Sequence, residues 1–337
     1  MLNNLGRMNV IVGPNGRGKT ALMEAIFLAA GANPELAIRI KAFRGLSAVS
    51  ISLTKNSYEA LWKDLFNNFD QSKQIEIKLS GTYDFCRELT IAYQREKTLM
   101  LELDGKDLLK ESASSIVPIL FEWKLSNGKS VSAEPQMRAE GIGIKFSNSL
   151  EALPLAFYSS ASQTTQEENA GYFSALSVQN KESEVIAALK SEFTFITGLS
   201  VEVWGGFPTL FASIKDINEK IPLNLVSSGV NKLISILLGI ANQAGGVICI
   251  DEIENGFYYD RLPSIWKLIL EFAIKFDVQI FASTHSLECL QAASQCALDS
   301  GKDTEFTLIQ SLSDKPGFKV HSGKAFIDAM SQQIDVR

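Results

Sequence analysis

One stretch limits what this chain can fold into more than any other: Gly13-Pro14-Asn15-Gly16-Arg17-Gly18-Lys19-Thr20. Two glycines with four residues between them, followed by Lys and Thr, form the pattern of a loop that cradles phosphates. An apolar run at 8–12 precedes the loop and predicts a buried strand, and an apolar stretch at 21–30 follows it and predicts a helix. Glycine lets backbone N–H groups face an anion, and the helix N-terminus adds partial positive charge.

All eight residues of this loop are therefore candidates for nucleotide binding. We expect Lys19 to reach the β- and γ-phosphates and Thr20 to place its hydroxyl on Mg²⁺. The alternative is a plain glycine-rich turn, which would require neither the strand before it nor the helix after it.

Composition and charge describe an ordinary globular protein. The chain has 337 residues, 46% of them hydrophobic and 21% charged, so one large domain or two ordinary ones are expected. The net charge of −6 does not favour a protein that wraps nucleic acid over its whole surface. A small basic cluster at 39–44 is best explained as a solvated face, with contact to DNA or an acidic partner as the alternative.

The cysteine and histidine content further restricts the class of protein. Four cysteines at 86, 249, 289 and 296 form no CxxC pair, which favours buried reduced thiols. Two histidines are too few for a His-rich metal site. We find no pattern of a leader peptide and no apolar window of membrane-spanning length, so we expect a cytoplasmic protein without a membrane partner.

Period-two alternation of apolar residues dominates the region 72–150 and predicts an antiparallel β subdomain. Asn127-Gly128 lies between two such runs and predicts a hairpin turn. The alternating runs lie at 75–79, 89–93, 99–103, 121–125, 129–133 and 142–146.

Other segments are predicted from their apolar content and their polar breaks. We expect strands at 48–53, 153–158, 201–203 and 210–212, helices at 57–69, 182–195 and 233–240, and a mobile polar surface loop at 159–170. A strand that leads into a phosphate loop needs neighbours, and only seven residues precede this one, so the neighbours must come from later in the chain. The tail, with Phe318, Val320 and Phe326, predicts a closing strand and helix.

Two acids follow the apolar run 247–250, namely Asp251 and Glu252. A buried parallel strand would place both carboxylates at its C-terminal edge, where ligands bind in open α/β sheets. We expect Asp251 to hold Mg²⁺ through water and Glu252 to polarise the attacking water. The alternative is a strand that ends in solvated acids.

A histidine follows the next apolar run, 278–282. His285 at the end of that strand could sense or neutralise a γ-phosphate, whereas a lone histidine more often has a structural role. Upstream, Ser227, Ser228 and Gly229 open an apolar helix, so their hydroxyl and N–H groups would face an anion. Any N-capped helix shows the same features, and the position just before the acidic strand favours the functional interpretation.

The order of these motifs resembles that of the ABC-type ATPase heads of the SMC, RecF and OLD group, and the sequence is most similar to compact bacterial OLD-like ATPases of the AAA family. The loop 13–20 matches their Walker A motif, and 247–252 matches Walker B. The stretch 224–233 resembles a shortened signature motif that lacks the second glycine and the acid of the fuller form. Residues 251–259 are similar to a DExENGLH stretch, with Tyr258 where His is common, and 282–286 matches a switch-histidine motif.

This resemblance implies an α/β P-loop NTPase fold with an ABC-ATPase-type core sheet, an antiparallel β subdomain and a helical lobe that carries the signature motif. It implies a single head over 1–337, divided into a P-loop core (1–70), the β subdomain (72–150), the signature lobe (151–240) and a core part with Walker B and the switch histidine (241–337). The glutamine loop cannot be placed, and Arg17 stands where a small residue is more common.

The resemblance also implies a mechanism. Two heads would form a head-to-tail homodimer or part of a higher homo-oligomer, with ATP and Mg²⁺ between Walker A of one copy and Ser228 and Gly229 of the other. Lys19, Glu252 and His285 would be the catalytic residues. Donors from a second subunit stabilise the charge of the transferred phosphoryl group only when docked.

Three functions are compatible with these motifs to different degrees. The first is an ATP-hydrolysing head that controls a separately encoded effector, a nuclease or toxin, in bacterial anti-phage defence; no Asp-x-Asp pair of a TOPRIM nuclease occurs in the chain. The second is a nucleotide-gated DNA-binding or repair clamp of RecF or SMC type, for which the basic cluster at 39–44 is the motivation. The third, a nucleotide kinase or GTPase, is disfavoured because no guanine-reading Asn/Thr-Lys-x-Asp motif is present.

Overall fold

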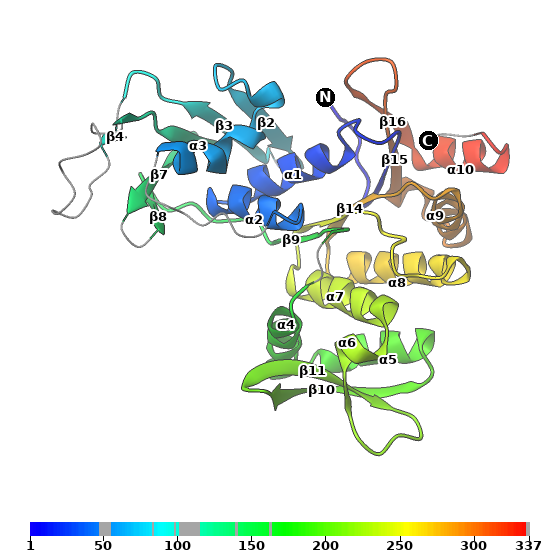
Figure 1. The fold of residues 1–337 in the computed structure, drawn as a ribbon. Coiled ribbons are helices and arrows are strands. Elements are labelled where there is room, and N and C mark those ends of the chain that lie inside the picture. Colours follow the sequence, from blue (N-terminus) through cyan, green and yellow to red (C-terminus); the bar gives the residue numbers. More distant parts are fainter. Residues whose placement is uncertain are drawn as a thin grey trace. The chain divides into compact units, whose positions relative to one another are not determined.

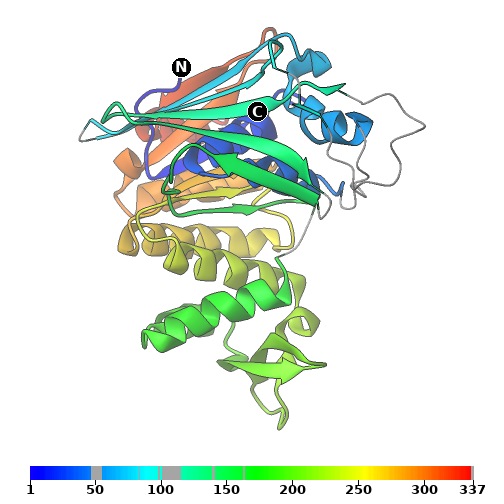
Figure 2. The ribbon, with the colours of Figure 1, turned by 90° about the vertical axis from the view of Figure 1, so that its left-hand side faces the viewer.

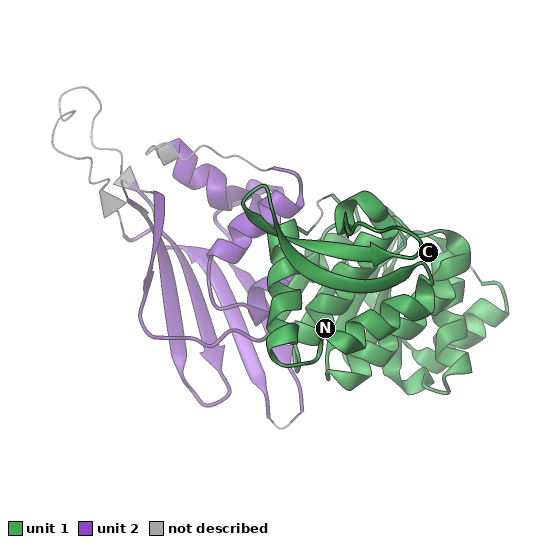
Figure 3. Ribbon diagram, turned by 90° about the horizontal axis from the view of Figure 1, so that it is seen from below, with its two compact units in different colours: residues 1–23, 154–337 green, residues 24–153 purple. Residues whose placement is uncertain are grey.

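The computed structural model describes residues 1–46, 55–82, 84–97, 99–100, 115–138, 141–161 and 164–334. The chain forms two compact units (Figure 3). Unit 1 comprises Met1–Met23 and Pro154–Arg337, and unit 2 comprises Glu24–Leu153. Unit 1 is thus built from two segments that are far apart in the sequence. The first contains the loop 13–20, and the second contains the acidic strand.

A six-stranded sheet in the order β16-β15-β1-β14-β13-β9 forms the centre of unit 1. Neighbouring strands from β15 to β9 are parallel, and β16 is antiparallel to β15. The mixed α/β fold with a mainly parallel sheet is as predicted. The strands are β1 (Met8–Val12), β9 (Leu155–Tyr158), β13 (Val247–Ile250), β14 (Gln279–Ser283), β15 (Phe306–Ser311) and β16 (Phe318–Ser322).

The central strands are mainly apolar and buried, as expected for a parallel sheet covered on both faces, and Asn9 within β1 is buried too. Every residue of β1 is buried, as are three of the four residues of β13. The expectation that β1 takes its neighbours from later sequence is confirmed, since β14 and β15 flank it. Strand β15, which lies between His285 and the tail strand, was not predicted from the sequence.

Helices and a small sheet are layered against this core (Figure 1). Helix α8 contacts α9 and α7, α7 contacts α4, and α4 contacts strand β11. Figures 1 and 2 show these elements in successive layers away from the core sheet. The elements are α1 (Lys19–Ala30), α4 (Gln166–Val178), α5 (Glu182–Glu192), α6 (Leu223–Val226), α7 (Ser228–Asn242), α8 (Leu262–Lys275), α9 (Leu287–Asp299) and α10 (Gly323–Ser331), with 3₁₀ turns at Tyr259–Arg261 and Asp303–Glu305.

Two local predictions in unit 1 need correction. The polar segment 159–170 is not a loop throughout, because Thr165 caps a helix by accepting a hydrogen bond from the backbone N–H of Glu168. Asn169 of that helix is fully buried, and its amide donates to the hydroxyl of Ser235 at 2.9 Å. The short strands around Gly205-Gly206 are longer than predicted: β10 (Ile196–Trp204) and β11 (Phe207–Ile214) form a hairpin, with β12 (Ile221–Pro222) beside β11.

Unit 2 contains the predicted antiparallel sheet, with strand order β2-β3-β6-β7-β8. One face packs on a core of aromatic side chains that includes Tyr58, Trp62, Phe121 and Trp123. The hairpin turn at Asn127-Gly128 is confirmed, and Gly128 has the positive φ of 78° that the turn requires. The elements are α2 (Glu35–Phe43), α3 (Lys55–Trp62), β2 (Ile75–Ser80), β3 (Cys86–Tyr93), β4 (Leu99–Met100), β5 (Ser115–Ile116), β6 (Ile119–Leu125), β7 (Ser130–Arg138) and β8 (Gly141–Phe146).

Some predictions in unit 2 are only partly met or lie outside the described residues. The helix predicted at 57–69 ends at Trp62 and continues as two 3₁₀ turns, Lys63–Leu65 and Asn67–Phe69. The predicted strand 48–53 and residues 101–103 of another lie outside the described residues. Among the described residues, no helix has the length and apolar character needed to cross a membrane.

The basic cluster at 39–44 is used inside unit 2. Lys41 is 5% exposed, and its ammonium lies 2.8 Å from the carboxylate of Asp64. Arg44 donates two hydrogen bonds to the carboxylate of Glu24, one of them at 2.8 Å. The expectation of a solvated face is therefore wrong for Lys41, and the pairing of two of the cluster's cations with acids of their own unit weakens the motivation for a DNA-binding surface.

Candidate functional site

Five parallel strands end at the same edge of the core sheet, and a predicted functional segment follows three of them. Strand β1 leads into Gly13, β13 leads into Asp251, and β14 ends two residues before His285. Strand β9, paired with β13, leads into Ser159 and Ser160. The carboxyl edge of a parallel sheet is where open α/β folds bind ligands, and the topology gathers the Walker A and Walker B residues there.

The loop 13–20 has a backbone that only glycine readily adopts at three points. Gly13, Gly16 and Gly18 have φ values of 132°, 72° and 86°. At Gly13 a Cβ atom would lie 2.0 Å from the hydroxyl oxygen of Ser311, so a side chain is excluded as well. Residues 14–17 are exposed, and α1 begins at Lys19. The loop therefore presents backbone N–H groups in front of a helix N-terminus, as anion binding requires.

Lys19 is curled back over this loop. Its ammonium donates to the backbone carbonyls of Gly13 at 2.7 Å and Pro14 at 2.9 Å, and the residue is 6% exposed. Burial lowers the pKa of Lys19, and the nearby charges of Asp251 and Glu252 act in the opposite direction. Because its present partners are neutral carbonyls, the ammonium can exchange them for phosphate oxygens without breaking an ion pair.

Three hydroxyl groups converge on the carboxylate of Asp251. Thr20 donates to Oδ2 at 3.4 Å and Ser160 to the same oxygen at 3.3 Å, while Ser283 donates to Oδ1 at 2.5 Å. The hydroxyl of Thr20 and the carboxylate of Asp251 are the hard oxygen donors that Mg²⁺ prefers. The predicted metal residues are thus adjacent and chemically suited to the ion.

Glu252 occupies a strained backbone conformation, with φ of 48°. Its N–H donates to the hydroxyl of Ser283 at 2.8 Å, and its carbonyl accepts from the ammonium of Lys232 at 2.8 Å. Its side-chain carboxylate accepts from the amide of Asn255 at 2.5 Å. Lys232, Asn255 and Ser283 lie within the stretches 224–233, 251–259 and 282–286 that resemble family motifs, but their contacts with Glu252 were not predicted from the sequence.

His285 is held through its backbone by an acid that the sequence analysis did not single out. Oε1 of Glu254 accepts from the backbone N–H of His285 at 2.9 Å and from that of Ser286 at 3.2 Å. Ser286 caps α9 by accepting from the N–H of Cys289. Glu254 lies within the stretch 251–259 that resembles DExENGLH, but that motif does not reveal the contact of Glu254 with the backbone of residues 285–286.

The Ser-Ser-Gly segment opens α7 as predicted. Ser227 is the N-cap residue, and Ser227 and Ser228 are exposed. Ser228 lines a cavity of about 150 Å³ together with Ser160 and Asn255. In the described part of the chain, no hydrogen bond or ion pair joins Ser228 to the loop 13–20 of the same copy.

Gly229 is required by packing rather than by its φ angle. A Cβ atom there would lie 2.5 Å from the backbone carbonyl oxygen of Gly256. The absence of a side chain therefore lets the start of α7 approach the segment that follows Glu252. This contact brings the signature segment and the Walker B segment of one copy together.

Replacing Gly229 with Ala should destabilise the protein by about 1–3 kcal/mol, because the backbone at Gly256 must shift. The matched control is Gly171→Ala in α4, where a Cβ would meet nothing within 4 Å. That change should stabilise the helix by up to about 1 kcal/mol. Urea unfolding followed by circular dichroism measures both; equal stability of the two variants would refute the packing role of Gly229.

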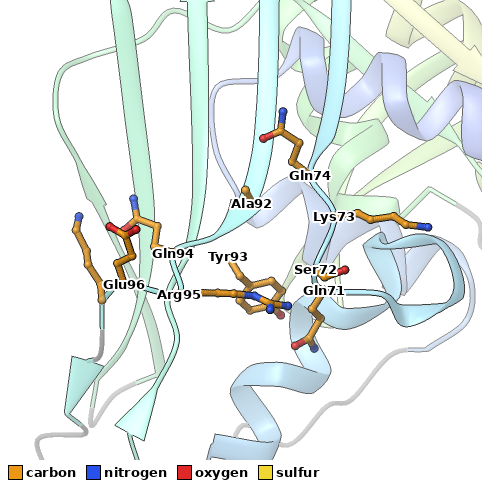
Figure 4. Close-up of a pocket in the computed structure, with 10 residues that line it drawn as sticks. Gln71, Ser72, Lys73, Gln74, Ala92, Tyr93, Gln94, Arg95 and Glu96 are labelled. Carbon is orange, nitrogen blue, oxygen red and sulfur yellow. The ribbon is translucent and has the colours of Figure 1, made fainter.

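Unit 2 has a separate cavity of about 630 Å³ at the start of β2 and the end of β3 (Figure 4). Its lining comes from residues 71–74 and 92–97 and includes no residue of the motifs above. The cation Lys73 on its rim is paired with Asp70 at 3.4 Å. The predicted catalytic and binding residues all lie in unit 1, so the candidate site is the sheet edge of that unit.

Comparison with known proteins connects the chain to ATPases. A family model described as AAA domain matches residues 4–222, which is more than half of the chain. A second model, described as AAA ATPase domain, matches residues 160–290. Together the two matches cover the loop 13–20, the signature segment, Asp251, Glu252 and His285.

A curated relative matches a shorter part of the chain than the family models do. An ATP/GTP phosphatase of Helicobacter pylori (strain ATCC 700392 / 26695) is 32% identical over 85 residues, which is 24% of this chain and 23% of that protein. The match therefore spans less than a quarter of that relative.

Among solved structures, an SMC head bound to the C-winged helix domain of ScpA is 13% identical, with a TM-score of 0.43 over 94% of this chain and 91% of that one. The SMC head domain of Thermotoga maritima is 10% identical, with a TM-score of 0.38 over 94% and 90%. TM-scores below 0.5 are too low to support a conclusion. The match of the family model over 4–222 does support one: the chain belongs to the AAA domain family.

Proposed function

We propose that this protein binds and hydrolyses ATP at the carboxyl edge of the sheet in unit 1. The observation that carries the proposal is the convergence of Lys19, Thr20 and Asp251, with the Thr20 hydroxyl 3.4 Å from the Asp251 carboxylate. In P-loop ATPases the equivalent three groups hold the β- and γ-phosphates and the metal ion. The name of the Helicobacter pylori relative, ATP/GTP phosphatase, supports hydrolysis of a nucleoside triphosphate.

Each residue has a role that follows from its position. Thr20 and Asp251 would hold Mg²⁺, which when bound neutralises charge on the phosphate oxygens. Lys19 would exchange the Gly13 and Pro14 carbonyls for phosphate oxygens. Glu252 would orient and polarise the attacking water, and His285 would contact the γ-phosphate.

The site is completed by a second copy in this proposal. Ser228 is exposed and makes no hydrogen bond to its own loop 13–20 within the described residues. Large apolar side chains near it are also exposed, with Leu225 at 71%, Tyr258 at 66% and Tyr259 at 62%. The contact of Gly229 with Gly256 places these segments beside each other. A face with an unused hydroxyl and exposed apolar groups is suited to docking against another head around ATP.

The finer biological role rests on the sequence resemblance alone. The likeness to OLD-like heads favours an ATP-dependent switch that controls a separately encoded nuclease or toxin in anti-phage defence. A DNA clamp is less well supported, since Lys41 and Arg44 of the basic cluster are paired with acids of their own unit.

Asp251→Asn tests the assigned site. The variant should release phosphate from ATP at least about 10-fold more slowly and need at least about 10-fold more Mg²⁺ for half-maximal activity, because an amide is a weaker ligand than a carboxylate. A coupled phosphate-release assay with Mg²⁺ titration measures both. Asp328→Asn, on an exposed position of α10, is the matched control. An Asp251→Asn protein with wild-type rate and Mg²⁺ dependence would place the metal elsewhere.

A further inference from the structure

Lys232 is a half-buried lysine of α7 whose ammonium is directed at backbone rather than at solvent. It donates to the carbonyl oxygen of Glu252 at 2.8 Å and lies 5.7 Å from the centre of the Phe257 ring. A lysine withdrawn from water is costly, and this cost is offset only where the ammonium makes specific contacts. The contact made here is with the residue assigned to activate water.

Glu254 makes a similar contact with backbone groups, at the second residue assigned to catalysis, His285. Its Oε1 accepts from the backbone N–H groups of His285 and Ser286. Within the described residues its Oε2 is buried and has no hydrogen-bond partner. A buried carboxylate oxygen without a donor is stabilised by nearby positive charge, and among the charges that act on Lys232 that of Glu254 has the largest effect.

The backbone of Glu252 needs support because of its conformation. A non-glycine residue with φ of 48° occupies a sparsely populated and strained backbone conformation. Both polar groups of its peptide backbone are held, the N–H by Ser283 and the carbonyl by Lys232. Lys232 lies one helical turn after Ser228, and both residues line the same cavity.

We infer that Lys232 and Glu254 are positioning residues: Lys232 fixes the backbone of Glu252, Glu254 fixes that of His285, and the pair links both to the Ser228 end of α7. The inference rests on the proposed function. It goes beyond that function because it assigns a physical route by which docking at Ser228 reaches the two catalytic residues. A shift of α7 moves Lys232, and Lys232 moves the carbonyl of Glu252.

The pKa of Lys232 predicts a pH dependence of kcat for this arrangement. Burial lowers the pKa of Lys232 to about 8, while Glu254, Glu252, Cys289 and Asp251 act in the opposite direction. The ammonium is therefore present below pH 8 and is lost as pH rises through that value. With its loss the charged hydrogen bond to Glu252 weakens, so kcat should fall above pH 8. An arginine at this position stays charged and should remove the fall.

Three variants test the roles: Lys232→Met, Lys232→Arg and Glu254→Gln. Lys232→Met and Glu254→Gln should lower kcat by about 10- to 100-fold while KM for ATP changes less than about 3-fold, because they disturb the geometry of catalysis and not the phosphate loop. Lys232→Arg should recover much of kcat and lose the decline above pH 8. The matched controls are Lys190→Met and Glu271→Gln, both at exposed helix positions.

Hydrogen exchange supplies a readout that does not require hydrolysis. Amides of 252–255 should exchange about 10-fold faster in Lys232→Met, and those of 284–287 about 10-fold faster in Glu254→Gln, whereas the controls should match the wild type. If the wild type does not hydrolyse ATP, the proposed function fails and exchange still decides the positioning roles. Unchanged exchange, or faster exchange with unchanged kcat, would overturn the inference.

Discussion

Replacing Glu252 with Gln should slow ATP hydrolysis by roughly 10²- to 10⁴-fold while nucleotide binding stays within a few fold of the wild type. Glutamine keeps the size of the side chain and can still accept from Asn255, which lies 2.5 Å from the carboxylate. It cannot take a proton from water. The backbone contacts to Ser283 and Lys232 do not involve the side chain and should survive.

The same variant should accumulate as an ATP-bound dimer. In the proposed cycle ATP joins two heads and hydrolysis releases them, so a head that binds without hydrolysing stays joined. Size-exclusion chromatography with light scattering, with and without ATP, measures the shift in mass, and phosphate release gives the rate. Glu271→Gln on α8 is the matched control. Hydrolysis by Glu252→Gln at the wild-type rate would show that another group activates the water.

Lys19→Ala should have the second large effect, and of a different kind. Lys19 contributes the positive charge nearest the loop carbonyls of Gly13 and Pro14. Its removal should weaken ATP binding by at least about 10-fold and reduce hydrolysis by about 10³-fold. The ATP-dependent dimer should disappear as well, in contrast to Glu252→Gln.

Titration of a fluorescent ATP analogue and phosphate release measure these losses. Lys190→Ala, a lysine on the exposed side of α5, is the matched control. Lys19 is buried and donates two hydrogen bonds, so the thermal unfolding of the variant must be compared too. A stably folded Lys19→Ala protein that binds and hydrolyses ATP normally would remove the loop 13–20 from the site.

The core of the fold could be predicted because its signals are local. Strands β1, β13 and β14 are mainly apolar runs, and each is followed by residues with a recognisable motif. Two features depend on tertiary context and gave no such signal. Strand β15 lies in a weakly patterned segment and is stabilised by pairing with β1. The first turn of α4 is polar in sequence, yet Asn169 is fully buried by its contact with Ser235.

The residues of the candidate site also differ in how well they could be predicted from the sequence. Thr20 and Asp251 could be named from their motifs, and the structure places them in hydrogen-bond contact. Ser160 and Ser283 donate to the same carboxylate, but a serine after an apolar strand is too common to be informative. Lys232 and Glu254 lie within the motif-like stretches 224–233 and 251–259, but they contact backbone groups, and the motifs do not reveal such contacts. Such supporting residues become visible only when the chain is folded.

The central claim is that two copies complete one another's site, and mixing two inactive variants tests it most directly. Lys19→Ala has a defective phosphate loop, and Ser228→Arg has a bulky cation at the exposed start of α7. In a head-to-tail heterodimer, the loop of the Ser228→Arg copy meets the intact Ser228 of the Lys19→Ala copy. An equimolar mixture should therefore regain about a quarter to a half of wild-type phosphate release, since each mixed dimer has one sound site of two and neither variant forms a sound site with itself. A mixture no more active than the two variants measured separately would contradict the shared site.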